Sequence, residues 1–282
     1  MLVVAALRWS DQRASVDPLT GEVRTDARTS GASAADRAAL EHALRLAEAF
    51  GGRCLAVTVG PAEAEEMLRE ALAAGAHEVL RIEGPEPGRT VGEDGHDTAR
   101  LLAAGLPARP DIVVCGDRSA DRGTGSTPAF LAHELGACQA LGLLELSVED
   151  GRLRALRRLD GGRRERLAVS LPAVCSVEPA GTLLRRASLP AVLAARRAEV
   201  PSVPAVAPAD AASGHGSAGV VRPYRPRPRV LPAPAGAEPH QRLLALTGAL
   251  VERTPPKVLR PETPAEAARE LLDYLRERGY LS

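Results

Sequence analysis

The sequence predicts an α/β fold in which helices cover both faces of a mostly parallel sheet. Two patterns support this expectation. Up to about residue 137, apolar runs alternate with helical patterns, and the apolar runs are continuous, as in strands that are buried on both faces. The chain has 282 residues, 45% of them hydrophobic, which is enough for a sizeable core.

The elements of this sheet can be placed in order along the first half of the chain. Strands are expected at 2–7, 54–59, 78–82 and 112–115, and helices at 36–50, 61–74 and 97–106. Ser33 is placed to cap the first helix, Pro61 opens the second, and Gly75 ends it. A Rossmann-like parallel sheet is then expected, and its ligand edge should gather the loops 8–12, 59–61 and 116–127.

A different pattern follows between residues 141 and 178. Two expected strands flank Asp160-Gly161-Gly162, a strong β-hairpin signal, and a third apolar strand comes after them. Seven arginines lie between residues 152 and 166. The added hairpin therefore presents either a solvated outer face or a docking surface for a partner.

We expect three regions: an α/β domain over 1–199, a Pro-rich linker or arm over 200–240, and a helical tail over 241–282. Alternating prolines favour an extended, polyproline-like path for the arm. The tail has expected helices at 242–251 and 264–278, the second with Thr263 and Glu266 in a capping box. Two helices are too few to form a core, so we expect them to pack on the main domain or on another chain.

The composition argues against several classes of function. The 36 basic and 36 acidic residues balance, whereas a nucleic-acid-binding surface needs an excess of positive charge. The six histidines lack the spacing of metal ligands, so no metal site is expected. Residues 1–11 resemble a strand rather than a signal peptide, and no apolar run reaches the roughly 20 residues of a membrane span. We therefore expect a cytoplasmic protein without membrane insertion.

Four cysteines, Cys54, Cys115, Cys138 and Cys175, are far apart and form no CxxC pair. Buried, reduced thiols are the first interpretation, and an exposed, redox-active Cys138 is the alternative.

The loop after the fourth expected strand has the features of an anion site. Gly116, Gly123 and Gly125 allow close approach of the backbone, and Thr127 is placed to cap a helix that starts at Pro128. Free amides at a helix start attract phosphate, although a plain strand-to-helix turn would also explain the pattern. No catalytic residue is expected, because Ser119 and Asp121 have no histidine nearby in the sequence and His133 should lie well inside the helix.

Several segments match one family in order. They are Gly116, Ser119-Ala120-Asp121 and Leu135-Gly136 around the loop, "VGPAEAEEMLREALAAGAHEVLRI", "LDGG", "LPAVCSVEPAG", "SLPAVLAARR", and the tail "PPKVLRPETPAEAARELLDYLRERGYL". With these motifs the chain resembles the beta subunit of electron transfer flavoproteins, over residues 1–198 and again over 252–281. The fold in that family is adenine nucleotide alpha hydrolase-like, and a divergent, mycofactocin-associated branch is the subgroup we expect.

The resemblance implies an electron carrier rather than an enzyme. It would take electrons from flavin-dependent dehydrogenases and pass them to a downstream acceptor through FAD. An alpha subunit would hold most of the FAD and receive the C-terminal tail. The beta subunit would bind a second nucleotide, which is AMP, or a second FAD in electron-bifurcating relatives.

The resemblance also implies roles for individual residues. The nucleotide-binding set is Ala5, Ser33, Asp36, Val59, Gly116, Asp121, Arg122, Gly123, Thr124, Gly125, Ser126 and Thr127. Gln12 would lie near the flavin. Leu189 would sit on a loop and anchor partner dehydrogenases, with Arg196 and Arg197 steering an acidic surface; the alternative is a Leu189 buried in the chain's own core.

This sequence departs from the family at several of these positions. The loop reads Asp121-Arg-Gly-Thr-Gly-Ser-Thr-Pro128 where the family has a second Asp and a Gln, and Leu7 replaces a lysine. Two other functions stay open. A stand-alone nucleotide-binding protein of the universal-stress type would be a monomer. An ATP-pyrophosphatase or adenylate hydrolase would need a Ser/Gly phosphate loop after the first strand, which "ALRWSD" lacks.

Overall fold

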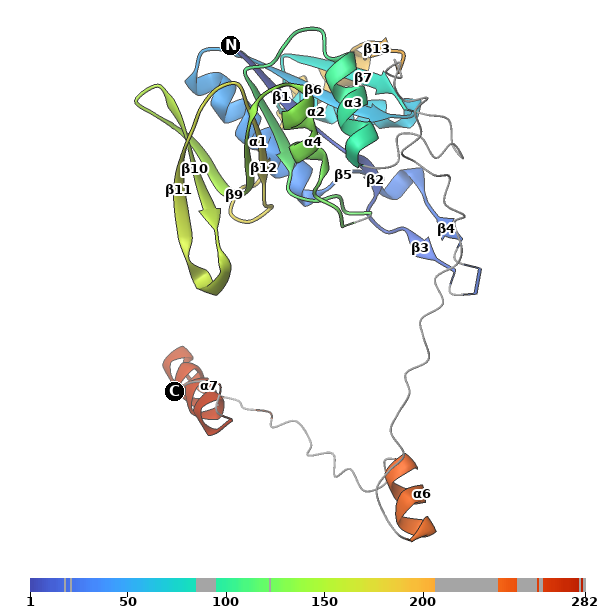
Figure 1. Cartoon of the computed structure of the whole chain (residues 1–282), viewed down its shortest axis with the longest axis vertical. Coiled ribbons are helices and arrows are strands. Elements are labelled where there is room, and N and C mark those ends of the chain that lie inside the picture. Colours follow the sequence, from blue (N-terminus) through green and yellow to red (C-terminus); the bar gives the residue numbers. More distant parts are fainter. Residues whose placement is uncertain are drawn as a thin grey trace. The chain divides into compact units, whose positions relative to one another are not determined.

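The computed structural model describes residues 1–17, 19–20, 22–84, 95–121, 123–205, 238–247, 258, 261–278 and 280. The chain divides into two compact units, Met1–Tyr224 and Arg225–Ser282, and each is described by itself. Figure 1 traces their elements along the sequence.

Among the described residues, nine strands form one sheet in the first unit, in the order β11-β10-β9-β12-β8-β1-β6-β7-β13. The strands are β1 (Leu2–Ala6), β6 (Arg53–Gly60), β7 (Glu78–Glu83), β8 (Ile112–Gly116), β9 (Cys138–Glu149), β10 (Arg152–Arg158), β11 (Arg164–Val169), β12 (Ala173–Val177) and β13 (Ser202–Val203). All neighbours pair in parallel except β9 with β10 and β10 with β11. The expected α/β fold with an added hairpin is confirmed.

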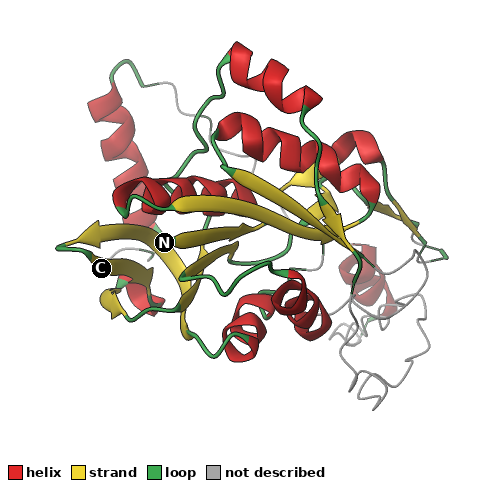
Figure 2. Cartoon of the chain, turned by 90° about the horizontal axis from the view of Figure 1, so that it is seen from above, coloured by secondary structure: helices red, strands yellow, loops and turns green. Residues whose placement is uncertain are grey.

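Helices cover both faces of this sheet (Figure 2). One face carries α1 (Ala34–Ala49) and α2 (Glu65–Ala74), which share a core with Val3 and Ala5 of β1. The other carries α3 (Gly95–Gly105) and α4 (Thr127–Glu134), which pack against Val4 and Ala6 of the same strand. Alternate residues of a buried strand thus point into two separate cores, which explains the continuous apolar runs. A fifth helix, α5 (Leu189–Arg197), packs on α2.

The helix ends follow their local signals. Ser33 caps α1 by accepting from the Asp36 N–H, and the Asp36 carboxylate accepts from the Ser33 N–H in return. Gly75 ends α2 in the left-handed region, with φ of 117°. The helix expected from Pro61 instead begins with one 3-10 turn, Ala62–Ala64, and becomes α-helical at Glu65.

The hairpin forms where Asp160-Gly161-Gly162 predicts it. Gly161 and Gly162 adopt φ of 69° and 73°, which only glycine does freely. The strand β9 is broken by a bulge beside Gly142, whose N–H donates to Ser176 Oγ at 3.0 Å. This irregularity interrupts the alternation of the sequence pattern, and β9 was not predicted as a strand.

Between β1 and α1 the chain makes a small excursion that was expected only as a loop. It contains β2 (Trp9–Asp11) paired with β5 (Ser30–Ala32), β3 (Ser15–Val16) paired with β4 (Val23–Arg24), and the 3-10 turn η1 (Ala27–Thr29). Asp11 holds it together, because its carboxylate accepts from Thr29 Oγ1 at 2.5 Å, Asp26 N at 2.7 Å and Arg13 N at 2.8 Å. These hydrogen bonds, the one from Thr29 first, lower the pKa of Asp11.

The sheet extends past the predicted boundary at residue 199. Ser202 and Val203 form β13 and pair with Arg81 and Ile82 of β7, so the first residues of the expected arm belong to the sheet. An extended segment next to prolines is suited to a sheet edge. The expected arm at 206–237 lies outside the described residues.

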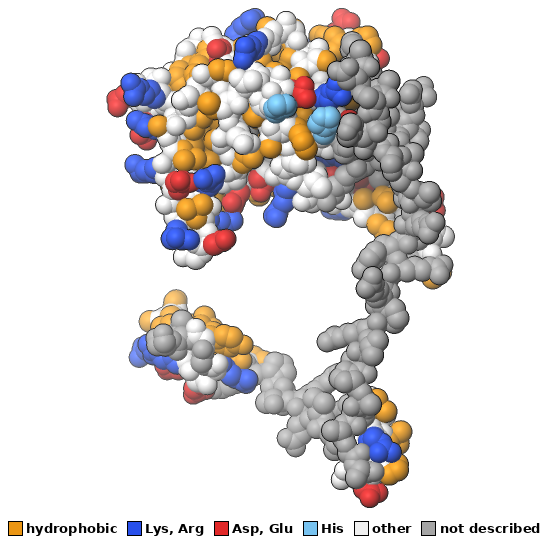
Figure 3. Space-filling view, in the orientation of Figure 1, with side chains coloured by type: hydrophobic (Ala, Val, Ile, Leu, Met, Phe, Trp, Pro, Cys, Tyr) orange, Lys and Arg blue, Asp and Glu red, His pale blue; other side chains and the backbone are white. Residues whose placement is uncertain are grey.

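The second unit contains α6 (Pro239–Thr247) and α7 (Pro264–Glu277), and none of their residues is buried. Thr263 caps α7 as expected, but the Glu266 carboxylate accepts from the Glu262 N–H rather than from Thr263. In α7 the apolar side chains gather along one side of the helix and the charged ones along another (Figure 3). Within the described residues, no helix is both long and apolar enough to cross a membrane.

Candidate functional site

A pocket lies where the strand order reverses. The chain proceeds from β1 through β6 to β7 and then returns to β8 on the other side of β1. The pocket lies beyond the carboxyl ends of β1 and β8. This is the usual position of a ligand site in such sheets. Its lining residues are Ala6, Leu7, Arg8, Asp36, Val59, Gly95, Thr98, Leu102, Cys115, Gly116, Arg118, Ser119, Thr124, Gly125, Thr127 and Pro128.

Asp36 joins the start of α1 to the end of β1. Its Oδ1 accepts from the Arg8 N–H at 3.2 Å, and its Oδ2 accepts from Ser33 N at 3.1 Å and Ser33 Oγ at 2.6 Å. Burial raises the pKa of Asp36 despite these hydrogen bonds, since only 6% of the residue is exposed. Both oxygens already have protein partners, so Asp36 shapes the pocket wall.

Arg8 and Asp121 form an ion pair at the edge of the pocket. Arg8 Nε donates to Asp121 Oδ1 at 2.9 Å, and Nη2 donates to Oδ2 at 2.6 Å. Burial acts to raise the pKa of Asp121, but the hydrogen bonds and charge of Arg8 outweigh it and lower that pKa. The Asp121 side chain is thereby a neutralised carboxylate rather than a free negative charge beside the pocket.

The loop before α4 folds on itself and leaves three amides free. Ser119 N donates to the Thr124 carbonyl at 2.8 Å, Gly123 N to the Ser119 carbonyl at 2.9 Å, and Thr124 N to Ser119 Oγ at 3.3 Å. Within the described part of the chain, the N–H groups of Gly125, Ser126 and Thr127 donate to no protein acceptor. Such amides at a helix start form an anion-binding position.

Two glycines of this loop are required by its own backbone. Gly123 has φ of 66°, and a Cβ there would meet open space. A Cβ on Gly125 would lie 2.3 Å from the Asp117 carbonyl oxygen. Gly125 therefore lets the loop backbone pass close to Asp117. The sequence had instead indicated that this glycine allows the close approach of a ligand. Gly116 similarly permits close packing of α1, because a Cβ there would lie 3.0 Å from Ala35 Cβ.

The expected cap of α4 is corrected by one residue. Thr127 is the first helical residue and Pro128 follows it, while Ser126 takes the cap position without a side-chain hydrogen bond. On the opposite wall, a Cβ on Gly95 of α3 would lie 2.3 Å from Ser126 Oγ. The two helix starts thus meet at the pocket, because Gly95 has no Cβ to collide with Ser126.

The structure brings together part of the predicted nucleotide-binding set. The predicted residues that line the pocket are Asp36, Val59, Gly116, Thr124, Gly125 and Thr127. Asp121 contacts the pocket only indirectly, through its ion pair with the lining residue Arg8. Gly123 and Ser126 belong to the loop before α4. Ala5 is fully buried in β1, and Ser33 is 6% exposed. Arg122 lies outside the described residues.

Sequence reasoning missed Arg8, Arg118, Gly95 and Thr98 as lining residues. The first two stand directly in the loops that were expected to meet, so a search for cations in those loops would have found them. The other two come from the start of α3, which only the strand order brings to this edge. Gln12 is exposed, and its amide Nε2 donates to Ser10 O at 2.9 Å and Ser10 Oγ at 3.0 Å.

The expected docking residues lie at the two ends of α5. Leu189 is the first residue of the helix rather than part of a loop, because Ser188 caps it by accepting from the Ala191 N–H at 3.3 Å. Its side chain is 71% exposed, so the alternative of a core leucine is wrong. Arg196 and Arg197 are exposed in the last turn.

Other reactive groups are not gathered into a site. Cys54, Cys115 and Cys175 are buried and Cys138 is exposed, and burial raises the pKa of both Cys54 and Cys175 to about 12. In the described ranges, no three His, Cys, Asp or Glu residues are placed to hold a metal ion. On the visible face of the first unit, acidic and basic side chains lie mainly toward the edges, where the two kinds are interspersed (Figure 3).

Comparison with known proteins agrees with this geometry. A family model described as "Electron transfer flavoprotein domain" matches residues 22–208. The chain is 33% identical over 268 residues to the electron transfer flavoprotein subunit beta of Chromohalobacter salexigens, covering 94% of this chain and 91% of that protein. It is 32% identical over 168 residues to the subunit beta of Mycobacterium tuberculosis, covering 57% and 62%. With protein FixA of Rhizobium meliloti the identity is 30% over 174 residues, covering 58% of each chain. The last two matches thus span less than two thirds of those relatives.

Proposed function

The chain belongs to the electron transfer flavoprotein family, and its relatives there are beta subunits and FixA proteins. We propose that it is the beta subunit of a heterodimeric electron carrier. An alpha subunit holds most of the FAD, and the FAD takes electrons from flavin-dependent dehydrogenases and passes them to a downstream acceptor. This chain binds a second nucleotide, helps to orient the FAD, and docks the partner proteins. The observation that supports the proposal best is the pocket at the β1/β8 edge, with its three free amides.

The pocket suits the phosphate end of an adenine nucleotide. The amides of Gly125, Ser126 and Thr127 supply donors, Arg118 supplies positive charge at the wall, and Arg8 balances the charge of Asp121. The apolar lining, Leu7, Val59 and Leu102, suits a base. AMP is the nucleotide that we propose, and a second FAD would identify an electron-bifurcating carrier.

The exposed ends of α5 support a docking role. Leu189 and Leu193 are 71% and 46% exposed and lie four residues apart, on one side of the helix. An apolar anchor beside two arginines fits a partner with an apolar pocket and an acidic rim. We propose that a donor dehydrogenase binds here.

Two surfaces are candidates for the contact with the alpha subunit. The apolar residues Leu271, Leu272 and Tyr274 of α7 are 57%, 42% and 41% exposed, and a helix with such a stripe needs a partner to cover it. The hairpin presents arginines of which Arg157 pairs with Glu165 and Arg158 with Glu178. We propose that α7 and the hairpin both contact the alpha subunit.

The competing functions make different demands on the molecule. An ATP-pyrophosphatase or adenylate hydrolase would need phosphate-binding glycines or serines after β1, where the chain has Leu7, Arg8 and Trp9. A stand-alone nucleotide-binding module would have no use for the exposed stripe of α7.

Coexpression with an alpha subunit tests the proposal. The two chains should copurify as a yellow heterodimer, and denaturation should release one FAD and one AMP per heterodimer. Release of two FAD molecules would indicate the bifurcating carrier. A colourless, monodisperse beta chain that ignores the alpha subunit would contradict the electron-carrier function.

A further inference from the structure

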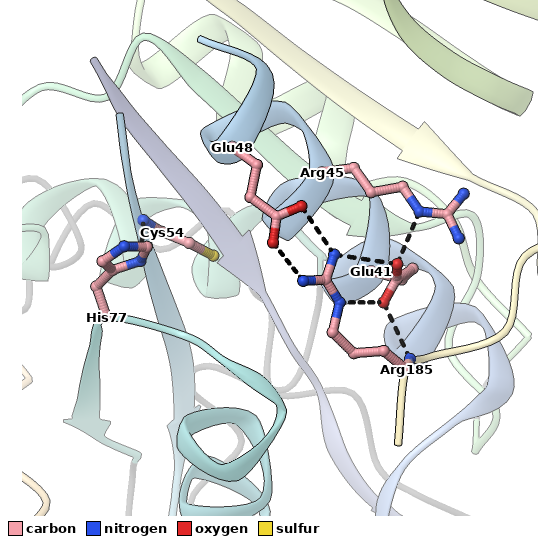
Figure 4. Close-up of polar contacts among 6 residues, drawn as sticks. All are labelled: Glu41, Arg45, Glu48, Cys54, His77 and Arg185. Carbon is pink, nitrogen blue, oxygen red and sulfur yellow. Dashed lines mark hydrogen bonds and ion pairs between the residues drawn. The ribbon is translucent and has the colours of Figure 1, made fainter. Parts of the chain in front are cut away.

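A single arginine ties the segment between β12 and α5 to α1. Arg185 donates from its backbone N–H and its Nε to Glu41 Oε2, both at 3.0 Å, and from Nη2 to Glu41 Oε1 at 3.2 Å. The same guanidinium donates from Nη2 to Glu48 Oε2 at 3.2 Å and from Nη1 to Glu48 Oε1. Figure 4 shows it lying between the two carboxylates of α1. We call Arg185, Glu41, Glu48 and Arg45 the clamp.

The clamp is neutral and has a buried centre, the Glu41 carboxylate, while the side chains of Arg185, Arg45 and Glu48 are partly exposed. Only 3% of Glu41 is exposed, and its Oε1 also accepts from Arg45 Nε at 2.7 Å. Burial acts to raise the pKa of Glu41, but the hydrogen bonds from Arg185 and Arg45 outweigh it and lower that pKa. The hydrogen bond from Arg185 lowers the pKa of Glu48 as well. Two carboxylates therefore face two guanidinium groups at neutral pH, so the buried charge of Glu41 is compensated.

By contrast, α5 packs on α2 through one narrow face, in which Ala191 and Val192 are half-buried. Ala195 is the residue of this helix that is buried, while Leu189 and Leu193 face solvent. Residues 178–188, which lead into the helix, form neither helix nor strand. The far end of α5 is attached independently of Arg185, because Val200 is 7% exposed and β13 pairs with β7 directly after it. The start of α5, which carries Leu189, has no such attachment to the sheet and follows the path of residues 178–188.

We propose that Arg185 is a positioning residue for α5. Its five hydrogen bonds to α1 fix the backbone four residues before Leu189, and so fix the direction in which Leu189 and Leu193 project. Preorganised anchors lose less conformational entropy on binding, so the clamp strengthens partner docking without contacting the partner. The docking part of this inference rests on the proposed function, whereas the ordering of α5 does not.

A nitroxide spin label on α5 measures the ordering directly. The label is placed by Leu193→Cys in a Cys138→Ser background, because Cys138 is the exposed native thiol among the described cysteines. The full chain, coexpressed with an alpha subunit, then carries Arg185→Met, Arg185→Lys or Arg45→Met. Arg45→Met is the matched control, since it also removes a guanidinium from Glu41 but leaves the 178–188 segment attached.

Arg185→Met should shorten the rotational correlation time of the label by about threefold, a change from ordered helix toward mobile loop. Arg185→Lys should restore part of the order, and Arg45→Met should leave the spectrum unchanged. An unchanged spectrum in Arg185→Met, or an equal change in Arg45→Met, would overturn the proposal.

A second variant separates positioning from general stability. Arg185→Met leaves Glu41 with less compensation and so lowers the melting temperature for a reason unrelated to α5. Arg185→Met with Glu41→Gln should recover the melting temperature while the label stays mobile. If the double variant recovered both the wild-type melting temperature and the wild-type order of the label, the clamp would be merely structural.

Reduction by a flavin dehydrogenase that reduces the wild-type complex supplies the docking readout. In Arg185→Met the KM for the complex should rise about fivefold at an unchanged kcat, because binding is weakened and the chemistry is not. If the label became mobile in Arg185→Met while the KM stayed unchanged, the ordering of α5 would have no effect on docking. If no dehydrogenase reduces the wild-type complex, the proposed function fails while the label still decides the ordering.

Discussion

The Arg8 guanidinium and the Asp121 carboxylate join the first and fourth strands of the parallel core, through hydrogen bonds of 2.9 and 2.6 Å at the edge of the pocket. Arg8 follows β1 and Asp121 belongs to the loop after β8. The pair therefore connects the loops that follow β1 and β8 at the point where the strand order reverses. It also balances the negative charge of Asp121, which would otherwise repel a phosphate.

Arg8→Met should raise the dissociation constant for AMP about tenfold, or ~1.4 kcal/mol. The substitution leaves the Asp121 carboxylate uncompensated next to the three free amides. Isothermal titration of AMP into the stripped heterodimer measures this. The double variant with Asp121→Asn should recover most of the affinity, and unchanged binding by Arg8→Met would contradict a phosphate at this edge.

Gly125→Ala should disrupt the loop as well as the nucleotide site. Its Cβ would lie 2.3 Å from the Asp117 carbonyl oxygen, which we expect to cost about 3 kcal/mol of unfolding free energy. Gly123→Ala is the matched control, because its Cβ would meet open space. It should lower the free energy of unfolding by only about 1 kcal/mol, the cost of a left-handed backbone conformation in alanine. Urea unfolding measures both; equal costs would show that the loop can relax around Gly125.

The features that the sequence predicted correctly are local ones. Ser33 and Gly75 mark helix ends because a cap depends on a few neighbouring residues, and Asp160-Gly161-Gly162 marks a turn for the same reason. The strand β9 was not predicted at all, because a bulge interrupts its alternation.

The contacts that shape the site are distant in sequence. Arg8 and Asp121 are 113 residues apart, and Arg185 and Glu41 are 144 residues apart. Such pairs depend on strand order and on the path of whole segments, which periodicity does not specify. The loops that would meet were predicted, but the cations that line the pocket and the role of Asp36 as a wall were not.

The clamp should make stability sensitive to acid. Arg185 holds the folded-state pKa of Glu41 and Glu48 below the ordinary value of about 4.5. Depressed carboxyl pKa values contribute stability above pH 4.5, and this contribution is lost as the pH falls through the folded-state values. Glu41→Gln should be less stable at pH 7 and lose less stability between pH 6 and pH 3. Urea unfolding at stepped pH measures the slopes, and equal slopes for wild type and variant would contradict the assignment.

Leu189→Ala should slow electron transfer from a dehydrogenase while it leaves stability almost unchanged. The side chain is 71% exposed, so the free energy of unfolding should change by less than about 0.5 kcal/mol. An anchor that enters a partner's pocket contributes roughly 2 kcal/mol to binding, which corresponds to a KM rise of about thirtyfold. Leu19→Ala is the matched control, because that leucine is 85% exposed and lies between β3 and β4, away from α5 in the chain. Stopped-flow reduction of the FAD, with a melting curve for each variant, separates the outcomes. A loss of several degrees in melting temperature, or an equal effect of Leu19→Ala on the KM, would remove Leu189 from the docking surface.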